Sequence, residues 1–506
     1  MVSGAAQSLN ILQRSPWDDL PAPCEASSSV PKHSRWEGSR FNVQATAGDG
    51  RLVVWNTLRG SISVFPAEKR SDVKLLLRRK PFDGPSEGLL GYLSDRGFVV
   101  PEGTDELRRL RLLAGQRHYR TDLLELTLLA SEDCNFRCEY CYEKFAHGTM
   151  QPHVRAGVKK MVESKIPGLR NLYISWFGGE PLYGFEAIED LSQFFLDTAD
   201  KYSILYSAHM TTNGYLLMPD IAEKLLSWKV NNYQITLDGP PQWHDRKRPT
   251  RTGEGTFHQI FANLKALHER SDPFFVNLRI NFDRENYPYV EDLLDLVARE
   301  LGGDDRFQIR FKAVGRWGGA NDPSLPILEG DEETLARFRL LEAARQRGLS
   351  TCDKVNQRNI PGGQVCYAAR PFHFLIGAQG KVMKCTVDLD TKPSNVVGQI
   401  GPDAELTIDW ERLAAWTESD FQIDPRCQSC VVLPICQAMS CPSVRIERGQ
   451  NPCTPIKFSL RQELLAALAE RSPTMRRVTV DRPLGTAVQQ IVRSTGQPHV
   501  HHSSGI

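Results

Sequence analysis

The chain has 506 residues, a formal net charge of +1 and 41% hydrophobic residues, an ordinary composition for a globular protein of about two to four domains. The near-neutral charge gives no general reason to expect nucleic acid or an anionic membrane as a partner, and no run of about 18 apolar residues could span a bilayer. Residues 1–30 lack the basic and then apolar pattern of a secretion signal, so we expect a cytoplasmic location.

Two small regions precede the main pattern of the chain. Residues 1–39 begin with a stretch rich in Ser, Ala and Pro and are predicted to be disordered. Residues 40–119 form an α+β pattern of winged-helix-like composition, with strands expected at 40–46, 51–57 and 97–100 and helices at 72–79, 86–95 and 106–116. We interpret this region as a peptide-recognition module, and the alternative is a packing appendage to the next domain. In either case its expected core residues are Val53, Trp55, Leu58, Phe65 and Leu93.

Strand and helix patterns alternate from residue 120 to 315. Strands are expected at 122–130, 171–176, 207–212, 231–237, 275–282 and 307–314, and helices at 152–164, 187–202, 220–228, 256–270 and 289–301. Six strand–helix units predict an α/β fold in which a parallel sheet curls into a partial (β/α)6 TIM-like barrel. Such a barrel has an open side that a long substrate could use.

Three segments complete the chain. Residues 316–348 are a charged connecting segment with an expected helix at 331–347, and residues 349–460 are rich in cysteine. A helical pattern at 456–471 leads into residues 461–506, which we interpret as a C-terminal helix and a flexible basic tail. His499, His501 and His502 in the tail could bind metal, but a solvated end is the simpler expectation.

Twelve cysteines in a chain without a secretion signal argue for metal or redox chemistry rather than for disulfides. Cys24 stands alone, three cysteines lie at 134, 138 and 141, and eight lie between Cys352 and Cys453. Three ligands and two sets of four account for eleven of them, which suggests three metal clusters. Cys24 is left over, and we interpret it as an incidental thiol.

The first cysteine group follows an apolar run, residues 123–130, that is typical of a buried strand. Its spacing is Cys134-x3-Cys138-x2-Cys141, so the three cysteines occupy the loop at the carboxyl end of that strand, where barrels place their chemistry. Three thiolates on one loop can hold three corners of an iron–sulfur cube and leave the fourth iron without a protein ligand. A zinc ion held by three thiolates and a water is the alternative.

This spacing resembles the signature of the radical S-adenosylmethionine (SAM) enzymes, and the later cysteines resemble those of their SPASM subgroup, over roughly residues 120–460. The resemblance implies that Cys134, Cys138 and Cys141 bind a catalytic [4Fe–4S] cluster whose open iron chelates SAM. It also implies reductive cleavage of SAM to a 5′-deoxyadenosyl radical, with electrons from a flavodoxin or ferredoxin. The chain has no recognisable flavin or nicotinamide motif of its own.

Later strand ends carry further motifs that the resemblance assigns to SAM. Gly178-Gly179-Glu180 resembles the GGE motif, in which glycines permit close approach and Glu180 accepts hydrogen bonds from the SAM ammonium. Tyr140 is placed near the adenine, and Asn213 and Thr236 are placed at strand ends suited to the ribose and the carboxylate. The run His244-Asp245-Arg246-Lys247-Arg248 resembles an H-D-x-x-R segment whose arginine pairs with the SAM carboxylate. We choose Arg248, although Arg246 and Lys247 are close by, and the alternative is a solvated loop.

By resemblance, the C-terminal cysteines form two auxiliary [4Fe–4S] clusters. Cys427, Cys430, Cys436 and Cys453 bind one of them. The other is bound by Cys366, Cys385 and Cys441, with Cys352 as the expected fourth ligand. Cys441 is displaced by one residue from the usual spacing. Taken alone, Cys427-x2-Cys430 could be half of a zinc ribbon.

Several SPASM relatives act on peptides, and one residue separates two of the possible reactions. In sulfatase-maturating enzymes an aspartate follows the cysteine that corresponds to Cys385, whereas this chain has Thr386, with Asp388 and Asp390 further along. We therefore expect a maturase that crosslinks a ribosomally synthesised precursor peptide through a thioether or C–C bond. A formylglycine-generating sulfatase maturase is the alternative, and a zinc-stabilised binding protein is the alternative outside enzymes.

Overall fold

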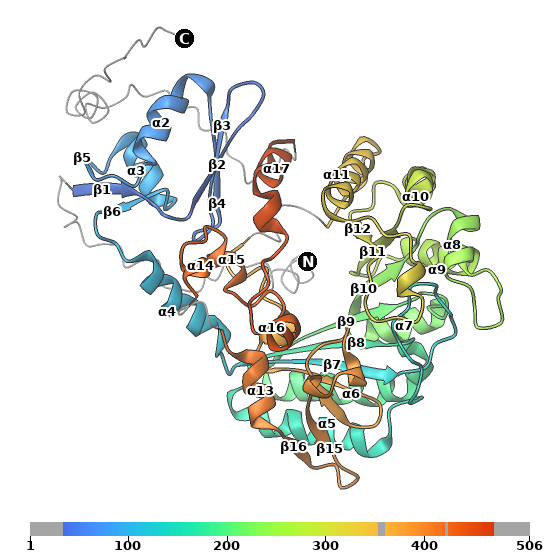
Figure 1. Ribbon diagram of the computed structural model, residues 1–506. Helices are drawn as coiled ribbons and strands as arrows, with labels where there is room; N and C mark the ends of the chain where they lie inside the picture. Colours follow the sequence, from blue (N-terminus) through green and yellow to red (C-terminus); the bar gives the residue numbers. More distant parts are fainter. Residues whose placement is uncertain (1–33, 353–359, 420–423, 470–506) are drawn as a thin grey trace.

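The structure, a computed structural model, describes residues 34–352, 360–419 and 424–469 (Figure 1). Cys24 and the three tail histidines lie outside these ranges. In the described part of the chain, ten strands form one sheet in the order β12-β11-β10-β9-β8-β7-β13-β14-β15-β16. Six of them are parallel neighbours: β7 (Leu123–Ser131), β8 (Asn171–Gly178), β9 (Leu205–Thr212), β10 (Val230–Thr236), β11 (Phe275–Phe282) and β12 (Phe307–Ala313).

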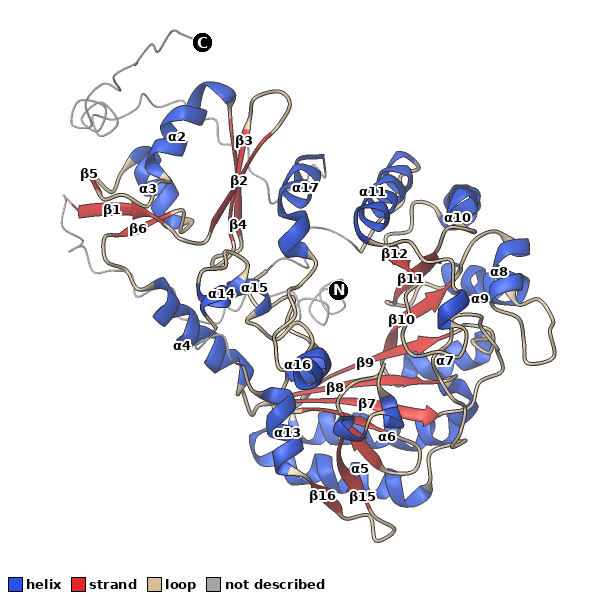
Figure 2. Ribbon diagram, in the orientation of Figure 1, coloured by secondary structure: helices blue, strands red, loops and turns tan. Residues whose placement is uncertain are grey.

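These six strands form an incomplete barrel, as expected from the sequence. The strands form a curved sheet with helices on its outer side (Figure 2). The barrel stays open because β7 pairs with β13 and not with β12. The helices of this region are α5 (Pro152–Lys165), α6 (Phe185–Tyr202), α7 (Pro219–Ser227), α8 (Pro241–Lys247), α9 (Phe257–His268), α10 (Val290–Leu301) and α11 (Gly330–Gln346). The expected strand and helix boundaries agree with the observed ones to within two residues.

Burial of one face explains both kinds of element. In β12, Phe307, Ile309, Phe311 and Ala313 are buried and alternate with half-buried residues, as in a strand with one covered face. In α10, the buried residues recur at helical spacing, with Leu293, Leu294, Val297 and Leu301 on one side. Both sets belong to a single apolar core between the sheet and its outer helices. Burying side chains of this size contributes about 1.5–3 kcal/mol each.

The N-terminal module contains more strands than the sequence pattern predicted. One sheet has the order β5-β1-β6, with β1 (Ser34–Gly38), β5 (Phe82–Gly84) and β6 (Val99–Pro101). The other has the order β2-β3-β4, with β2 (Asn42–Thr46), β3 (Leu52–Asn56) and β4 (Ser61–Phe65). Helices α2 (Arg70–Leu76), α3 (Gly88–Asp95) and α4 (Glu106–His118) complete it.

The expectation of disorder over residues 1–39 was therefore wrong for its last residues. Ser34–Gly38 forms β1, which pairs antiparallel with both β5 and β6, and Trp36 is buried in the module core. The five expected core residues are all buried. One face of the β2-β3-β4 sheet, with Val53 and Trp55, packs against residues of the cysteine-rich region and α17 (Ile456–Ala469).

The cysteine-rich region continues the barrel sheet and then turns to short helices. Its strands are β13 (His373–Ile376), β14 (Lys381–Met383), β15 (Val396–Ile400) and β16 (Leu406–Ile408). Its helices are α13 (Trp410–Thr417), α14 (Pro425–Gln428), α15 (Leu433–Cys436) and α16 (Pro442–Arg448). Among the described residues, no helix is long and apolar enough to cross a membrane.

Candidate active site at the carboxyl ends of the barrel strands

The three cysteines of the first group lie on one loop directly after β7. The backbone N–H of Cys134 donates to Asp133 Oδ1 at 2.8 Å, and the N–H of Phe136 donates to the Cys134 sulfur at 3.3 Å. Burial and the neighbouring thiols raise the pKa of Cys134 and of Cys141 to about 12. Without a cation, these thiols stay protonated at neutral pH, so the loop is suited to a positively charged metal centre that deprotonates its ligands.

The two glycines after β8 allow close approach to the cysteine loop. A Cβ on Gly178 would lie 2.0 Å from the Ser131 carbonyl oxygen, and one on Gly179 would lie 2.6 Å from that of Asp133. The N–H of Gly179 and that of Glu180 donate to these same two carbonyl oxygens. The approach that the structure shows is therefore to the cysteine loop itself, whereas the sequence suggested approach to a ligand. Contact of both glycines with SAM stays a prediction.

Glu180 is fully buried and ties the ends of two strands together. Its Oε1 accepts from the Leu182 N–H at 3.0 Å and from Thr212 Oγ1 at 2.8 Å, and its Oε2 accepts from the Asn213 N–H at 2.8 Å. Burial raises the pKa of this carboxyl to about 6, against the lowering effect of these donors. A carboxylate has about four acceptor positions, so one remains for a ligand ammonium.

The Tyr140 hydroxyl is held by residues from three other segments. It donates to Asp238 Oδ2, and it accepts from Arg248 Nη1 at 3.0 Å and from Asn281 Nδ2 at 2.9 Å. Asp238 is fully buried, and its other oxygen accepts from the Asn281 N–H at 3.0 Å. The ring of Tyr140 is therefore fixed beside the cysteines before any ligand arrives.

Among the three basic residues of the H-D-x-x-R run, the structure brings only Arg248 to this network. Arg246 lies at the surface in an ion pair with Glu285, and Lys247 is buried against Asp283 at 2.6 Å. Burial alone would lower the pKa of Arg248, but the neighbouring Tyr140, Cys138 and Asp238 favour the charged guanidinium and outweigh burial, so its pKa is raised. Its Nε is a buried donor without a hydrogen-bond partner, which fits a ligand carboxylate.

Two predicted residues of the SAM site lie beside this network. Asn213 directly follows β9, and its Nδ2 donates to Asn135 Oδ1 at 2.7 Å and lies 3.8 Å from the Cys134 sulfur. Thr236 is buried at the end of β10. Asp238 and Asn281 were not singled out as site residues from the sequence. Their position at the ends of β10 and β11 was the available signal.

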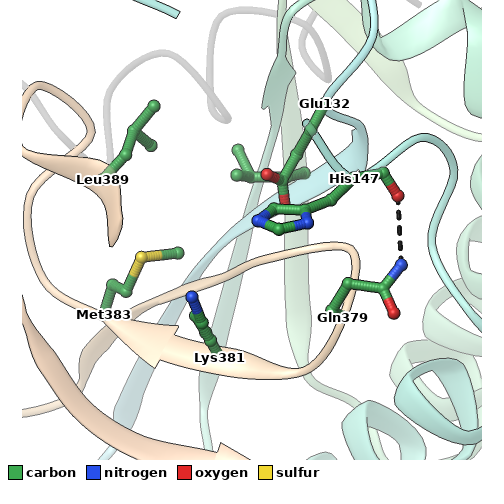
Figure 3. Close-up of a pocket in the computed structure, with 7 residues that line it drawn as sticks. Glu132, His147, Gln379, Lys381, Met383 and Leu389 are labelled. Atoms are coloured by element: carbon green, nitrogen blue, oxygen red, sulfur yellow. Dashed lines mark hydrogen bonds between the residues drawn. The ribbon is translucent and has the colours of Figure 1, made fainter. Parts of the chain in front are cut away.

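A small pocket lies behind the cysteine loop (Figure 3). Glu132 and His147 come from the loop, and Gln379, Lys381 and Met383 come from the β13–β14 hairpin. The Gln379 side chain donates to the His147 carbonyl oxygen at 3.0 Å, which joins the two sides. None of the residues predicted to bind SAM lines this pocket, so we interpret it as the seam between hairpin and loop.

The structure brings seven C-terminal cysteines together in the two predicted groups. The pKa of the Cys366 thiol is raised to about 12 by burial and by the Cys385 and Cys441 thiols beside it. In the second group, the pKa of Cys436 is raised to about 11 by burial, with Cys430 and Cys453 close enough to contribute. Cys427 also lies beside Cys436 and Cys430. No trio of His, Cys, Asp or Glu side chains among the described residues is arranged to hold a single metal ion.

Cys352 is placed differently from these seven. It is buried next to the start of β12, with its sulfur 3.7 Å from Asn277 Oδ1 and 3.8 Å from the Gln308 carbonyl oxygen. These contacts are with the barrel strands, and they lend no support to Cys352 as a cluster ligand. Its role as the fourth ligand beside Cys366 stays a prediction.

Comparison with known proteins shows which family the barrel region resembles. Residues 128–297 match the model of the radical SAM superfamily. The radical SAM cyclopropyl synthase TigE of Paramaledivibacter caminithermalis is 25% identical over 40% of this chain and 46% of its own length. A cysteine-type anaerobic sulfatase-maturating enzyme of Clostridium novyi is 30% identical over 28% of this chain and 38% of its own. The matches thus span about half or less of these curated relatives.

A solved structure extends the similarity of fold. Native anSMEcpe with bound AdoMet and a Cp18Cys peptide superposes with a TM-score of 0.52 at 17% identity, over 69% of this chain and 97% of that chain. It shares the partial barrel and the cysteine-rich region. The cluster and the SAM molecule that this family binds fit the three thiols, the open acceptor position of Glu180 and the unpartnered Nε of Arg248. The barrel of this chain therefore matches the radical SAM superfamily, and the chain resembles the SPASM peptide maturases of that superfamily.

Proposed function

We propose that this chain is a radical SAM maturase that oxidatively modifies a ribosomally synthesised precursor peptide, forming an intramolecular thioether or C–C crosslink. The observation that carries the proposal is the convergence of three thiols with the buried Glu180 and Arg248 at the carboxyl ends of the barrel strands. When a [4Fe–4S] cluster and SAM are bound there, they supply reductive cleavage of SAM to a 5′-deoxyadenosyl radical.

Each residue of the site has a distinct task in this proposal. Cys134, Cys138 and Cys141 hold the cluster, and Arg248 pairs with the SAM carboxylate through its free Nε. Glu180 accepts from the SAM ammonium with its remaining lone pair. Tyr140, fixed by three partners, gives the adenosyl group a rigid wall, while Asn213 and Thr236 border it. Burial of the site excludes water from the reacting atoms.

The substrate class is inferred from two features of the fold. The barrel is open between β12 and β13, so an extended peptide could reach the concave face of the sheet. The N-terminal module, now residues 34–119, packs on the cysteine-rich region through the β2-β3-β4 sheet, and we assign it to docking the precursor. The solved structure of anSMEcpe contains bound AdoMet and a bound peptide, which supports the same substrate class here.

Local contacts favour crosslinking over sulfatase maturation. Thr386, which stands where sulfatase maturases have a catalytic aspartate, shares a hydrogen bond with the Tyr367 hydroxyl at 2.7 Å. Asp388 is buried in contact with Ser443 and in an ion pair with Lys392 at 2.9 Å. Neither side chain is available as a free base at this position.

The C-terminal cysteines complete the proposed electron path. We assign Cys427, Cys430, Cys436 and Cys453 to one auxiliary [4Fe–4S] cluster, and Cys366, Cys385 and Cys441, with Cys352, to the other. A substrate radical that closes a crosslink must give up one electron, and an auxiliary cluster is a suitable acceptor. Electrons for SAM cleavage would come from a flavodoxin or ferredoxin.

The proposal is tested in two stages. The anaerobically purified chain is loaded with iron and sulfide, and 5′-deoxyadenosine is measured by mass spectrometry after addition of SAM and reductant. A colourless, zinc-only protein that forms no 5′-deoxyadenosine would support the zinc-stabilised binding protein instead. The chain is then co-expressed with small open reading frames beside its gene, and peptide masses are recorded. Loss of two hydrogens supports a crosslink, whereas formylglycine in a sulfatase peptide would overturn this choice.

A further inference from the structure

The concave face of the barrel sheet is polar. On β12 the buried residues face the outer helices, and the alternate residues Gln308, Arg310 and Lys312 face the concave side. The strand register places Thr127, Ser175, His209, Gln234, Asn277 and Arg279 on the same face, together with the apolar Leu129 and Phe177. The interior of a closed barrel is usually filled with branched apolar side chains, so this lining is suited to a polar ligand.

Arg310 is the side chain of this face that most clearly lacks a partner. Its Nε is buried and makes no hydrogen bond, and no ion pair joins Arg310 to any residue in the described ranges. Arg310 as a whole is half-buried, and its buried Nε without an acceptor carries a desolvation penalty that a bound carboxylate would offset. Planar guanidinium groups also match carboxylates through two parallel hydrogen bonds.

Among the described residues, the surroundings of Arg310 add positive charge and no free carboxylate. Arg279 is its direct neighbour across the β11–β12 pairing, and its Nε donates to Asn281 Oδ1 at 2.8 Å. His209 lies close enough for Arg310 to help burial lower its pKa to about 4, so the imidazole is neutral.

The two acids of this face are already engaged. Glu125 pairs with Arg370 of the cysteine-rich region. Asp238 accepts from Tyr140 and from the Asn281 backbone. In the described part of the chain, the concave face therefore presents the guanidinium groups of Arg279 and Arg310, while Glu125 and Asp238 have other partners.

We propose that the concave face of the sheet binds a carboxylate group of the substrate peptide, with Arg310 as its anchor and Arg279 beside it. The inference rests on the proposed function and names its substrate class: a peptide whose modified segment carries an acidic side chain or ends in a free carboxylate. Arg248, at the carboxyl ends of the strands, is reserved for the SAM carboxylate. Arg310 acts on a second carboxylate, at the concave face of the sheet.

The test uses three fluorescein-labelled pentapeptides and fluorescence anisotropy, with the loaded protein and saturating SAM but without reductant. One peptide has a central aspartate and an amidated end, one has asparagine and an amidated end, and one has asparagine and a free carboxylate. The wild-type chain is expected to bind one of the two anionic peptides at least about tenfold tighter than the neutral one. The preferred peptide identifies the source of the carboxylate.

Three variants make the result specific to Arg310. Arg310→Gln should reduce the preference to within about twofold, and Arg310→Lys, which keeps the charge without the fork, should leave part of it. The matched control is Arg316→Gln, which removes one positive charge from an exposed arginine paired with Glu329. It should keep the full preference. A thermal melt checks folding, and if Arg310→Gln fails to fold, the loss in Arg310→Lys decides.

Equal binding of all three peptides by the wild type, or an unchanged preference in Arg310→Gln, would overturn the carboxylate site. The proposed function is judged separately by 5′-deoxyadenosine formation in the wild type. A chain that cleaves SAM but shows no Arg310-dependent preference refutes the inference alone. A chain that shows the preference but never cleaves SAM supports the carboxylate site and refutes the proposed function.

Discussion

The cysteine loop after β7 and the C-terminal cysteine groups hold their thiols by different means. The loop carries three cysteines within eight residues. Hydrogen bonds fix its surroundings without any metal: Glu180 accepts from Thr212, and Asp238 accepts from Tyr140 and from the Asn281 N–H. The seven C-terminal thiols come from segments spread between Cys366 and Cys453, on loops and on helices of only four residues. Such short helices have little stability of their own.

This difference separates the expected effects of losing each group. At the loop, the polypeptide is pre-organised, so metal loss should remove chemistry and leave the fold intact. At the C-terminal groups, the proposed auxiliary clusters would join several short segments, so the free energy of cluster binding would also be folding free energy. Four predictions test this contrast.

The largest effect is expected from Cys134→Ala/Cys138→Ala/Cys141→Ala. Formation of 5′-deoxyadenosine should fall to the level of a protein-free control, and bound iron should drop by about four atoms per chain. The thermal midpoint should stay within a few degrees of the wild type because the surrounding network remains. Cys24→Ala is the control and should behave as the wild type. Surviving SAM cleavage in the triple variant would refute radical SAM chemistry.

The second prediction concerns the C-terminal groups. Cys427→Ala/Cys436→Ala should lower the thermal midpoint by at least about 5 °C, measured by circular dichroism, because the short helices α14 and α15 lose the metal that joins them. Removing iron from the wild type with a chelator should give a shift of the same size, and the chelator should shift the variant much less. If the variant melts like the wild type, the contrast between the two regions is wrong.

The third prediction tests the carboxylate contact at the loop. Arg248→Gln should weaken SAM binding by about ten- to a hundredfold, since a charge-assisted hydrogen bond is lost and the site stays buried. Equilibrium dialysis with labelled SAM measures it directly. The control is Arg246→Gln, two residues away and exposed, which should change the affinity less than about twofold. Equal losses in both variants would assign the effect to general charge.

The barrel could be predicted because each of its strands and helices has a clear pattern in its own local sequence. Strands such as Phe275–Phe282 are continuous apolar or alternating runs, and Pro152 and Pro219 stand at the first turn of their helices. The short strands β1, β4 and β5 were missed, and Ser34–Gly38 gives no periodic signal.

The site was predictable where its residues sit within a motif. Glu180 and Arg248 stand at recognised spacings, whereas Asp238 and Asn281 meet only because β10 and β11 are neighbours in the sheet. The polar side chains of the concave face were visible in the sequence as an alternation of polar and apolar residues. Strands of a parallel sheet covered on both faces are almost wholly apolar, and the alternation in residues 307–313 departs from that pattern.

The smallest predicted effect lies at the seam between the N-terminal module and the C-terminal region. His118, at the end of α4, bonds through Nε2 to the Thr417 carbonyl oxygen on α13 at 2.8 Å, and burial lowers its pKa below the ordinary value of 6.5. His118 therefore becomes protonated near pH 6.5 in the unfolded chain, but only at a lower pH in the folded chain. Stability contributed by neutral His118 is complete above pH 6.5 and is lost as the pH falls through the lower folded value.

His118→Gln keeps a donor for Thr417 but does not titrate. Between pH 7.5 and 5.5, its stability should fall less steeply than that of the wild type, by up to one proton or about 1.4 kcal/mol per pH unit. Denaturant unfolding at several pH values measures how steeply stability changes with pH in both proteins.

Some pH dependence should remain in His118→Gln, because burial also lowers the pKa values of His209 and His244. His258→Gln, on an exposed side of α9, is the control. If stability falls equally steeply with pH in His118→Gln and in the wild type, the contact between α4 and α13 does not respond to pH. The difference in stability between the two cysteine regions would then come from metal binding alone.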